Sequence, residues 1–207
     1  MGMFNAFNDP ITFILTIPAV LWAISLHEFC HAYAAKLVGD PTAELHGRLT
    51  LSPLSHFDMM GTLMLLIVGL GWAKPVPVNM RYFRNPRRDI VLVSLAGIAG
   101  NILTAAVCLL VVRSWGNAIF AMTGLPGIIL LTRMYFINIG LAVFNLLPIP
   151  PLDGSKVIYA FLPFSALRYY YWLEQYGMFI LLGLVMAGAI RMVFDPVFRV
   201  ATTLLLA

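Results

Sequence analysis

Five consecutive residues, His27-Glu28-Phe29-Cys30-His31, place two imidazoles and a carboxylate inside a strongly apolar segment. On a helix, side chains four residues apart lie on the same face, so both imidazoles can reach one metal ion. This H-E-x-x-H spacing is typical of zinc sites in which the glutamate takes a proton from water. Because polar groups are costly inside a membrane, we expect His27 and His31 to bind a metal and Glu28 to act as general base.

Two histidines do not complete a catalytic zinc site, which uses three protein ligands and leaves a fourth position to water. The candidate third ligand is Asp153, which follows three prolines between positions 148 and 151. These prolines end a helix and hold the backbone extended, so Asp153 is presented from irregular backbone near the membrane. Gly154 permits a tight turn or a close backbone approach there. His27, His31 and Asp153 can therefore share one metal if their segments end on the same side.

The composition indicates an integral membrane protein. Of the 207 residues, 61% are hydrophobic and 11% are charged, and the mean hydropathy is +0.90; an ordinary soluble domain is about a quarter charged. Apolar segments lie at about 11–38, 59–72, 90–112, 125–147 and 176–190, the last continuing less cleanly to 206. We expect an α-helical integral membrane protein with five to six transmembrane helices, all in one domain over residues 1–207. Its core would cover about residues 11–160, and C-terminal transmembrane segments would cover about 176–206.

The second apolar segment is too short to cross a bilayer. It has about 14 residues, whereas a spanning helix needs roughly 20. The stretch at 47–52 before it alternates like a strand, and Pro75 and Pro77 after it exclude a helix but allow an edge strand. We therefore expect a small, partly re-entrant β element near residues 44–80, covered by protein or facing a watery cavity.

The basic residues then fall mainly on one side of the membrane. Leaving aside the C-terminal end, nine lie on one side and only Arg113 on the other. The nine are Lys36, Arg48, Lys74, Arg81, Arg84, Arg87, Arg88, Lys156 and Arg168. An excess of Lys and Arg marks the cytoplasmic side, so we expect the active site to open toward the cytoplasm. The same loops explain the formal charge of +4 without a nucleic-acid partner.

The two motifs together resemble the site-2 protease family of intramembrane zinc metalloproteases, in its short form without PDZ or CBS domains. The likeness covers about residues 20–160 and includes His27-Glu28-x-x-His31, Asn145-x-x-Pro148-x-Pro150-Pro151-Leu152-Asp153-Gly154, and further matches at 47–51, 73–79 and 94–101. Departures from the family pattern occur at Ser52, Ile98 and Ser155, none of which is a candidate ligand.

The resemblance implies one zinc ion on His27, His31 and Asp153, with Glu28 as catalytic base and Asn145 assisting at the oxyanion. It implies transmembrane protein or peptide substrates in the lipid bilayer, which we expect to be a prokaryotic cell membrane, and it leaves the oligomeric state open. A substrate helix must unwind before attack, and the proline-bearing edge near Val76 and Val78 is suited to hold the unwound strand through backbone hydrogen bonds.

Several alternatives remain open at this point. Asn145 could bridge helices instead, and Asn101 either packs helices, orients a group behind the metal ligands, or acts directly at the site. His56 and Asp58 are better explained by local hydrogen bonding than by a second metal pair. A non-enzymatic membrane protein that binds or transports zinc is the alternative function, and a zinc hydrolase acting on lipids is a third. Glu28 favours the protease, because a carrier does not need a general base between its ligands.

Overall fold

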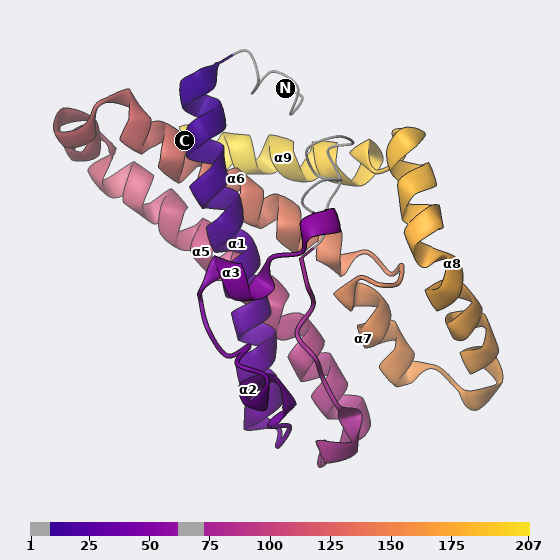
Figure 1. Cartoon of the computed structure of the whole chain (residues 1–207). Helices are drawn as coiled ribbons and strands as arrows, with labels where there is room; N and C mark the ends of the chain where they lie inside the picture. Colours follow the sequence, from indigo (N-terminus) through magenta and orange to yellow (C-terminus); the bar gives the residue numbers. More distant parts are fainter. Residues whose placement is uncertain (1–8, 62–72) are drawn as a thin grey trace.

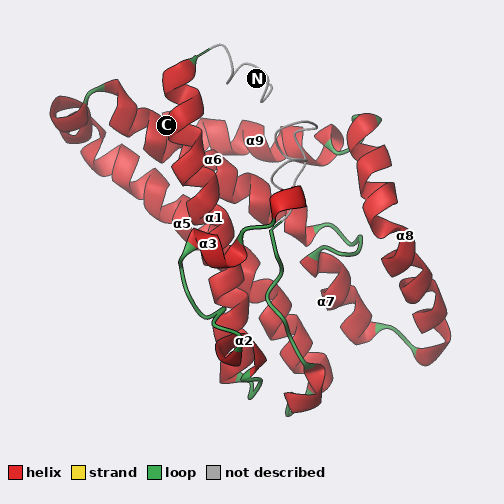
Figure 2. Ribbon diagram, viewed as in Figure 1, coloured by secondary structure: helices red, strands yellow, loops and turns green. Residues whose placement is uncertain are grey.

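The computed structural model describes residues 9–61 and 73–207, and within them the regular structure is entirely helical (Figures 1 and 2). Three helices are long and apolar enough to cross a membrane: α1 (Pro10–Leu37), α5 (Pro86–Thr123) and α6 (Leu125–Leu146). Helices α8 (Leu167–Met186) and α9 (Arg191–Leu206) meet at a bend of 66° and make a fourth span if counted together. The described residues thus confirm a helical membrane protein, but they do not confirm five to six spans.

The β element expected near residues 44–80 is not confirmed either. The described parts of this region hold only irregular backbone and the short helices α2 (Thr42–Leu45), α3 (Pro53–His56) and η2 (Met80–Tyr82). Residues 62–72, which make up most of the second apolar segment, lie outside the described residues. Pro75 and Pro77 have no N–H to give to a neighbouring strand, which limits pairing along this edge.

Helix α1 begins and ends where the sequence predicts. The carboxylate of Asp9 caps it by accepting a hydrogen bond of 3.1 Å from the Ile11 amide, and Pro10 occupies the first helical position. The helix runs for 28 residues as one element, with Pro18 inside it. It stops at Leu37, just before Gly39, whose φ of +107° favours glycine.

Helices α5 and α6 form an antiparallel hairpin that packs against α1 (Figure 1). Helix α5 has 38 residues and extends well beyond the apolar segment at 90–112, while α6 ends at Leu146, just before the predicted proline stop. Small residues on α1 are buried, and two of them meet α5: Ala35 packs with Ile90 and Val93, and the Ala23 carbonyl accepts a hydrogen bond from Asn101. Small side chains let helix backbones approach closely, which is how helices associate within a membrane.

The polypeptide after α6 is held in place by two glycines. Helix α7 (Asp153–Phe161) begins directly against the end of α6, because a Cβ atom on Gly154 would lie 2.2 Å from the Leu146 carbonyl oxygen. After η3 (Phe164–Ala166), helix α8 passes the loop at residues 147–152, which we call the proline loop. A Cβ atom on Gly177 of α8 would lie 1.9 Å from the Pro150 carbonyl oxygen. The start of α7 is therefore fixed between α6 and α8.

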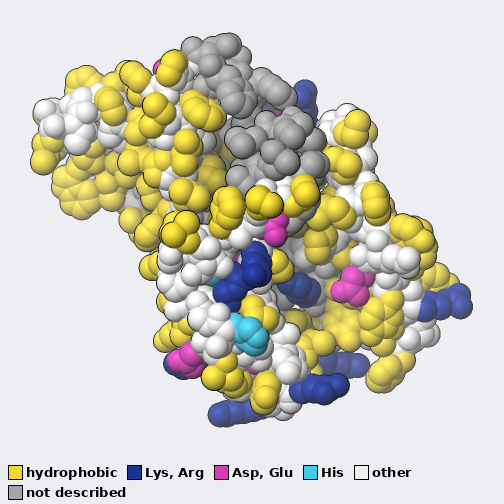
Figure 3. All heavy atoms as spheres, viewed as in Figure 1, with side chains coloured by type: hydrophobic (Ala, Val, Ile, Leu, Met, Phe, Trp, Pro, Cys, Tyr) yellow, Lys and Arg dark blue, Asp and Glu magenta, His cyan; other side chains and the backbone are white. Residues whose placement is uncertain are grey.

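The two ends of the molecule differ in surface character (Figure 3). Hydrophobic side chains cover the α5–α6 hairpin at the upper left of the view, as expected for a surface that faces lipid. Lys and Arg side chains gather at the lower end, where α1 ends and α5 begins. Lys36, Arg81, Arg84, Arg87 and Arg88 are all exposed there.

Candidate metal centre

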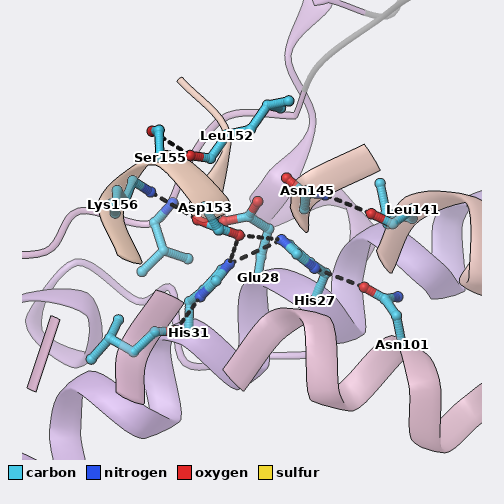
Figure 4. A network of polar contacts seen from close by, with 12 residues as sticks. His27, Glu28, His31, Asn101, Leu141, Asn145, Leu152, Asp153, Ser155 and Lys156 are labelled. Carbon is cyan, nitrogen blue, oxygen red and sulfur yellow. Dashed lines mark hydrogen bonds and ion pairs between the residues drawn. The ribbon is translucent and has the colours of Figure 1, made fainter. Parts of the chain in front are cut away.

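His27 and His31 of α1 and Asp153 of α7 meet at one buried point (Figure 4). The Asp153 Oδ2 atom lies 3.1 Å from His27 Nε2 and 2.9 Å from His31 Nε2, and the two Nε2 atoms are 2.9 Å apart. All three residues are less than a tenth exposed. Within residues 9–61 and 73–207, this is the one cluster of such side chains that could hold a metal ion. The fold thus joins two motifs 126 residues apart in the sequence.

The hydrogen bonds on the far side of each ring determine where the imidazole protons lie. His31 Nδ1 is 2.7 Å from the Val93 carbonyl oxygen, which can only accept, so Nδ1 donates. His27 Nδ1 is 2.7 Å from Asn101 Oδ1 and donates to it in the same way. In the neutral rings, both Nε2 lone pairs therefore point at each other and at a carboxylate oxygen. Such an arrangement is repulsive without a cation, and two imidazoles with one carboxylate are a donor set that zinc accepts.

The spacing of the three donor atoms also fits zinc. A tetrahedral ion with ligand distances of ~2.0–2.1 Å separates its donors by about 3.3 Å. The observed separations are a few tenths of an ångström shorter, so small side-chain movements suffice. Gly97 of α5 keeps the space open, because a Cβ atom there would lie 2.6 Å from His31 Nε2 and 2.7 Å from the His27 ring.

Glu28 lies beside this cluster, half-buried, and its carboxylate is held by irregular backbone (Figure 4). Its Oε2 accepts a hydrogen bond of 3.0 Å from the Val76 amide. The edge near Val76 and Val78, which we expected to hold an unwound substrate, thus has one amide bound to Glu28, and its role toward a substrate stays a prediction.

The segment around Val76 is anchored on both sides. The Lys74 amide donates to the His56 carbonyl at 2.9 Å, and the Asn79 amide donates to the fully buried Asp40 carboxylate at 2.7 Å. The segment is therefore held at three points, by α3, by α1 and by the turn after α1, and the central contact orients the Glu28 carboxylate.

The surroundings of Asp153 favour the charged form of its carboxylate. It stands in the first turn of α7, where the helix dipole favours negative charge, and its Oδ1 accepts a hydrogen bond of 2.9 Å from Lys156 Nζ. Burial raises the pKa of Asp153, and the positive charge of Lys156 beside Oδ1 lowers it. Oδ2 is directed at the two rings.

The remaining candidates are distributed around this centre. Asn145 lies near it in the last turn of α6, but its amide nitrogen donates to the Leu141 carbonyl at 3.0 Å (Figure 4). Its catalytic role stays a prediction. His56 is buried with Nε2 at 2.9 Å from the Thr50 carbonyl oxygen, in line with the local hydrogen bonding that we expected.

Sequence reasoning missed four contributors to the site. It assigned no role to Gly97, to Asn138, which binds Asn101, to Lys156, or to the Val93 carbonyl. Asn138 could have been found from the sequence, because it stands seven residues before Asn145 and thus on a similar face of one apolar helix. The Val93 carbonyl could not have been found, because every residue has a backbone carbonyl.

The packing of Gly177 against the proline loop gives a first prediction. We expect Gly177→Ala to displace Pro150, which precedes Asp153 by three residues, and to weaken zinc binding by the full chain. The measurement is zinc retained per purified protein at a fixed chelator concentration. The matched control is Gly183→Ala on the same helix, since a Cβ atom there meets nothing within 4 Å. Equal zinc retention by both variants would show that α8 does not support the loop.

The chain is similar in sequence to a peptidase family and to bacterial proteins named for zinc metalloprotease activity. The profile of "Peptidase family M50" matches residues 121–184, which include Asp153. The chain is 40% identical over 167 residues to "Putative zinc metalloprotease YwhC" of Bacillus subtilis, covering 78% of this chain and 75% of the relative. It is 34% identical over 184 residues to "Putative zinc metalloprotease Rip2" of Mycolicibacterium smegmatis, covering 86% and 69%. No solved structure matches the chain.

Proposed function

Because the chain belongs to peptidase family M50, the site-2 protease family of intramembrane zinc metalloproteases, we propose that His27, His31 and Asp153 hold one zinc ion and that Glu28 is the catalytic base. The observation that carries this proposal is the convergence of three buried donor atoms. Two of them are imidazole nitrogens whose protons lie on the opposite side of the ring. All four residues belong to the single domain that we propose for residues 1–207, with its core at about 11–160.

The chemistry divides between the metal and the side chains. When bound, zinc polarises a carbonyl group and lowers the pKa of water from about 15.7 toward ~7. Glu28 takes the proton of the attacking water and later delivers it to the leaving amine. The Val76 amide holds Oε2 of this carboxylate, so the other oxygen is the one that receives the proton.

Asn145 is the proposed donor to the oxyanion that forms at the scissile carbonyl. Its amide nitrogen donates to Leu141 in the structure, so its side chain must rotate, or use its second N–H, to reach a substrate.

The substrates of such an enzyme are membrane proteins, and regulated intramembrane proteolysis is the role of the family. We propose cleavage in or near their transmembrane segments. The relatives come from bacteria, which supports a prokaryotic cell membrane as the location. Spans beyond α1, α5 and α6, and a β element near residues 44–80, stay predictions.

We also propose that the active site opens toward the cytoplasm. His31 lies six residues from the end of α1, which is about 9 Å along a helix. Gly97 and Asp153 contact the same site from helices that start at or near this end. The exposed basic residues gather at this end of the molecule, and an excess of them favours the cytoplasmic side.

The proposal is tested with the full chain in liposomes together with a membrane-spanning peptide. We expect cleavage of the peptide, loss of cleavage when a chelator removes the metal, and recovery when zinc is added back. Mass spectrometry of the fragments identifies the bond that is cut. Zinc flux into the liposomes with no cleavage of membrane-spanning peptides would contradict the proposal and favour a zinc transporter.

A further inference from the structure

Two asparagine side chains are completely buried between the helices that form the site. Asn101 of α5 and Asn138 of α6 are both 0% exposed. A buried amide without hydrogen bonds is costly in proteins, and these two are well paired. Asn101 Nδ2 donates to Asn138 Oδ1 at 2.8 Å and to the Ala23 carbonyl at 3.0 Å, and Asn138 Nδ2 donates to the Met134 carbonyl at 2.8 Å.

The acceptors around this pair determine which end of each side-chain amide is the oxygen and which is the amino group. The Met134 carbonyl can only accept, so the amino group of Asn138 must face it and its oxygen must face Asn101. The amino group of Asn101 then points at two acceptors, and its oxygen must face His27 Nδ1, 2.7 Å away. Reversing either amide would bring two acceptors together. His27 Nδ1 must therefore carry the ring proton, which leaves Nε2 free to bind a cation.

We propose that Asn138 is a positioning residue for the metal site, acting through Asn101 to hold His27 as the Nδ1–H tautomer. This inference rests on the zinc site proposed above. It makes zinc binding depend on an α6 side chain that contacts none of the three ligands. We call the hydrogen-bonded chain from Asn138 through Asn101 to His27 the relay. His31 needs no relay, because its Nδ1 donates directly to the Val93 carbonyl. Partners behind a metal-binding histidine typically contribute about 10–100-fold to metal affinity.

The test is a double-mutant cycle on zinc affinity, measured for the full chain in detergent by competition with a coloured chelator. We expect Asn101→Leu to weaken zinc binding about 10–100-fold. Asn138→Leu should weaken it less, because the Ala23 carbonyl still holds the Asn101 amide. The double variant should bind zinc no more weakly than Asn101→Leu alone, since Asn138 acts only through Asn101. Additive losses would overturn the relay and assign Asn138 a separate role in helix packing.

A second readout reports the tautomer without any metal. Imidazole nitrogen shifts in ¹⁵N-histidine NMR distinguish the two neutral tautomers, and the His27→Gln variant assigns the signal. We expect His27 Nδ1 to be fully protonated in the wild-type protein and partly unprotonated in Asn138→Leu. An unchanged tautomer in Asn138→Leu would overturn the inference.

Two further variants distinguish loss of the relay from general disruption of the fold and from loss of the zinc site. Asn117→Leu makes the same replacement at an exposed position of α5 and should change neither readout. Wild-type zinc affinity in His27→Gln would contradict the proposed zinc site. Loss of zinc in His27→Gln together with unchanged zinc affinity in both asparagine variants would contradict only the relay.

Discussion

Gly97→Ala is expected to abolish zinc binding and, with it, proteolysis. The new Cβ atom would lie 2.6 Å from His31 Nε2 and 2.7 Å from the His27 ring, well inside van der Waals contact with both candidate ligands. Helix α5 cannot move away without loss, because it also supplies Val93 and Asn101, which bind both rings from behind. We expect the loss of zinc affinity to exceed the ~10–100-fold that removal of an outer partner costs.

The control for this prediction stands on the same helix. Gly116→Ala introduces the same methyl group where nothing lies within 4 Å, so its zinc affinity should equal that of the wild type. The measurement is zinc content per chain after dialysis against a weak chelator. If Gly97→Ala retained zinc as firmly as Gly116→Ala, the metal would have to lie elsewhere.

The second large effect is expected from Glu28→Gln. Removal of a general base typically slows a reaction by about 10²–10⁴-fold, so cleavage of a membrane-spanning peptide should fall by that range. Zinc affinity should change little, because Glu28 is not among the three converging groups. The glutamine oxygen can still accept the hydrogen bond from the Val76 amide, so the segment beside it should keep its place.

The comparison for Glu28→Gln is Glu174→Gln, which makes the same change at an exposed position of α8. It should cleave at the wild-type rate. Initial rates at saturating peptide, with zinc content measured on the same samples, separate a lost base from a lost metal. Full activity in Glu28→Gln would remove this residue from the proposed mechanism.

Local spacing and the demands of one metal ion were enough to indicate the three candidate ligands that the structure brings together. His27, Glu28 and His31 are recognisable because helix periodicity alone places them together. Asp153 was found because a catalytic zinc site needs a third ligand and the prolines before it end a helix near the membrane. Each of these inferences uses only short-range information and the demands of one metal ion.

What the sequence could not predict depends on which helix faces which. An asparagine on an apolar helix indicates a hydrogen bond but not its partner, so the link from Asn138 through Asn101 to His27 appears only in the folded chain. The strand-like pattern near residues 44–80 is not confirmed for a related reason. A strand needs a partner strand, and the amides of Lys74, Val76 and Asn79 bind the His56 carbonyl of α3 and two carboxylates.

The length of α5 has a consequence for how the protein sits in lipid. Its 38 residues extend about 57 Å, nearly twice the ~30 Å hydrocarbon thickness of a typical bilayer. A helix that exceeds the bilayer in this way must tilt, project into water or thicken the lipid around it. Since α5 also carries the contacts behind His27 and His31, a change in membrane thickness is transmitted to the helix against which the metal ligands are aligned.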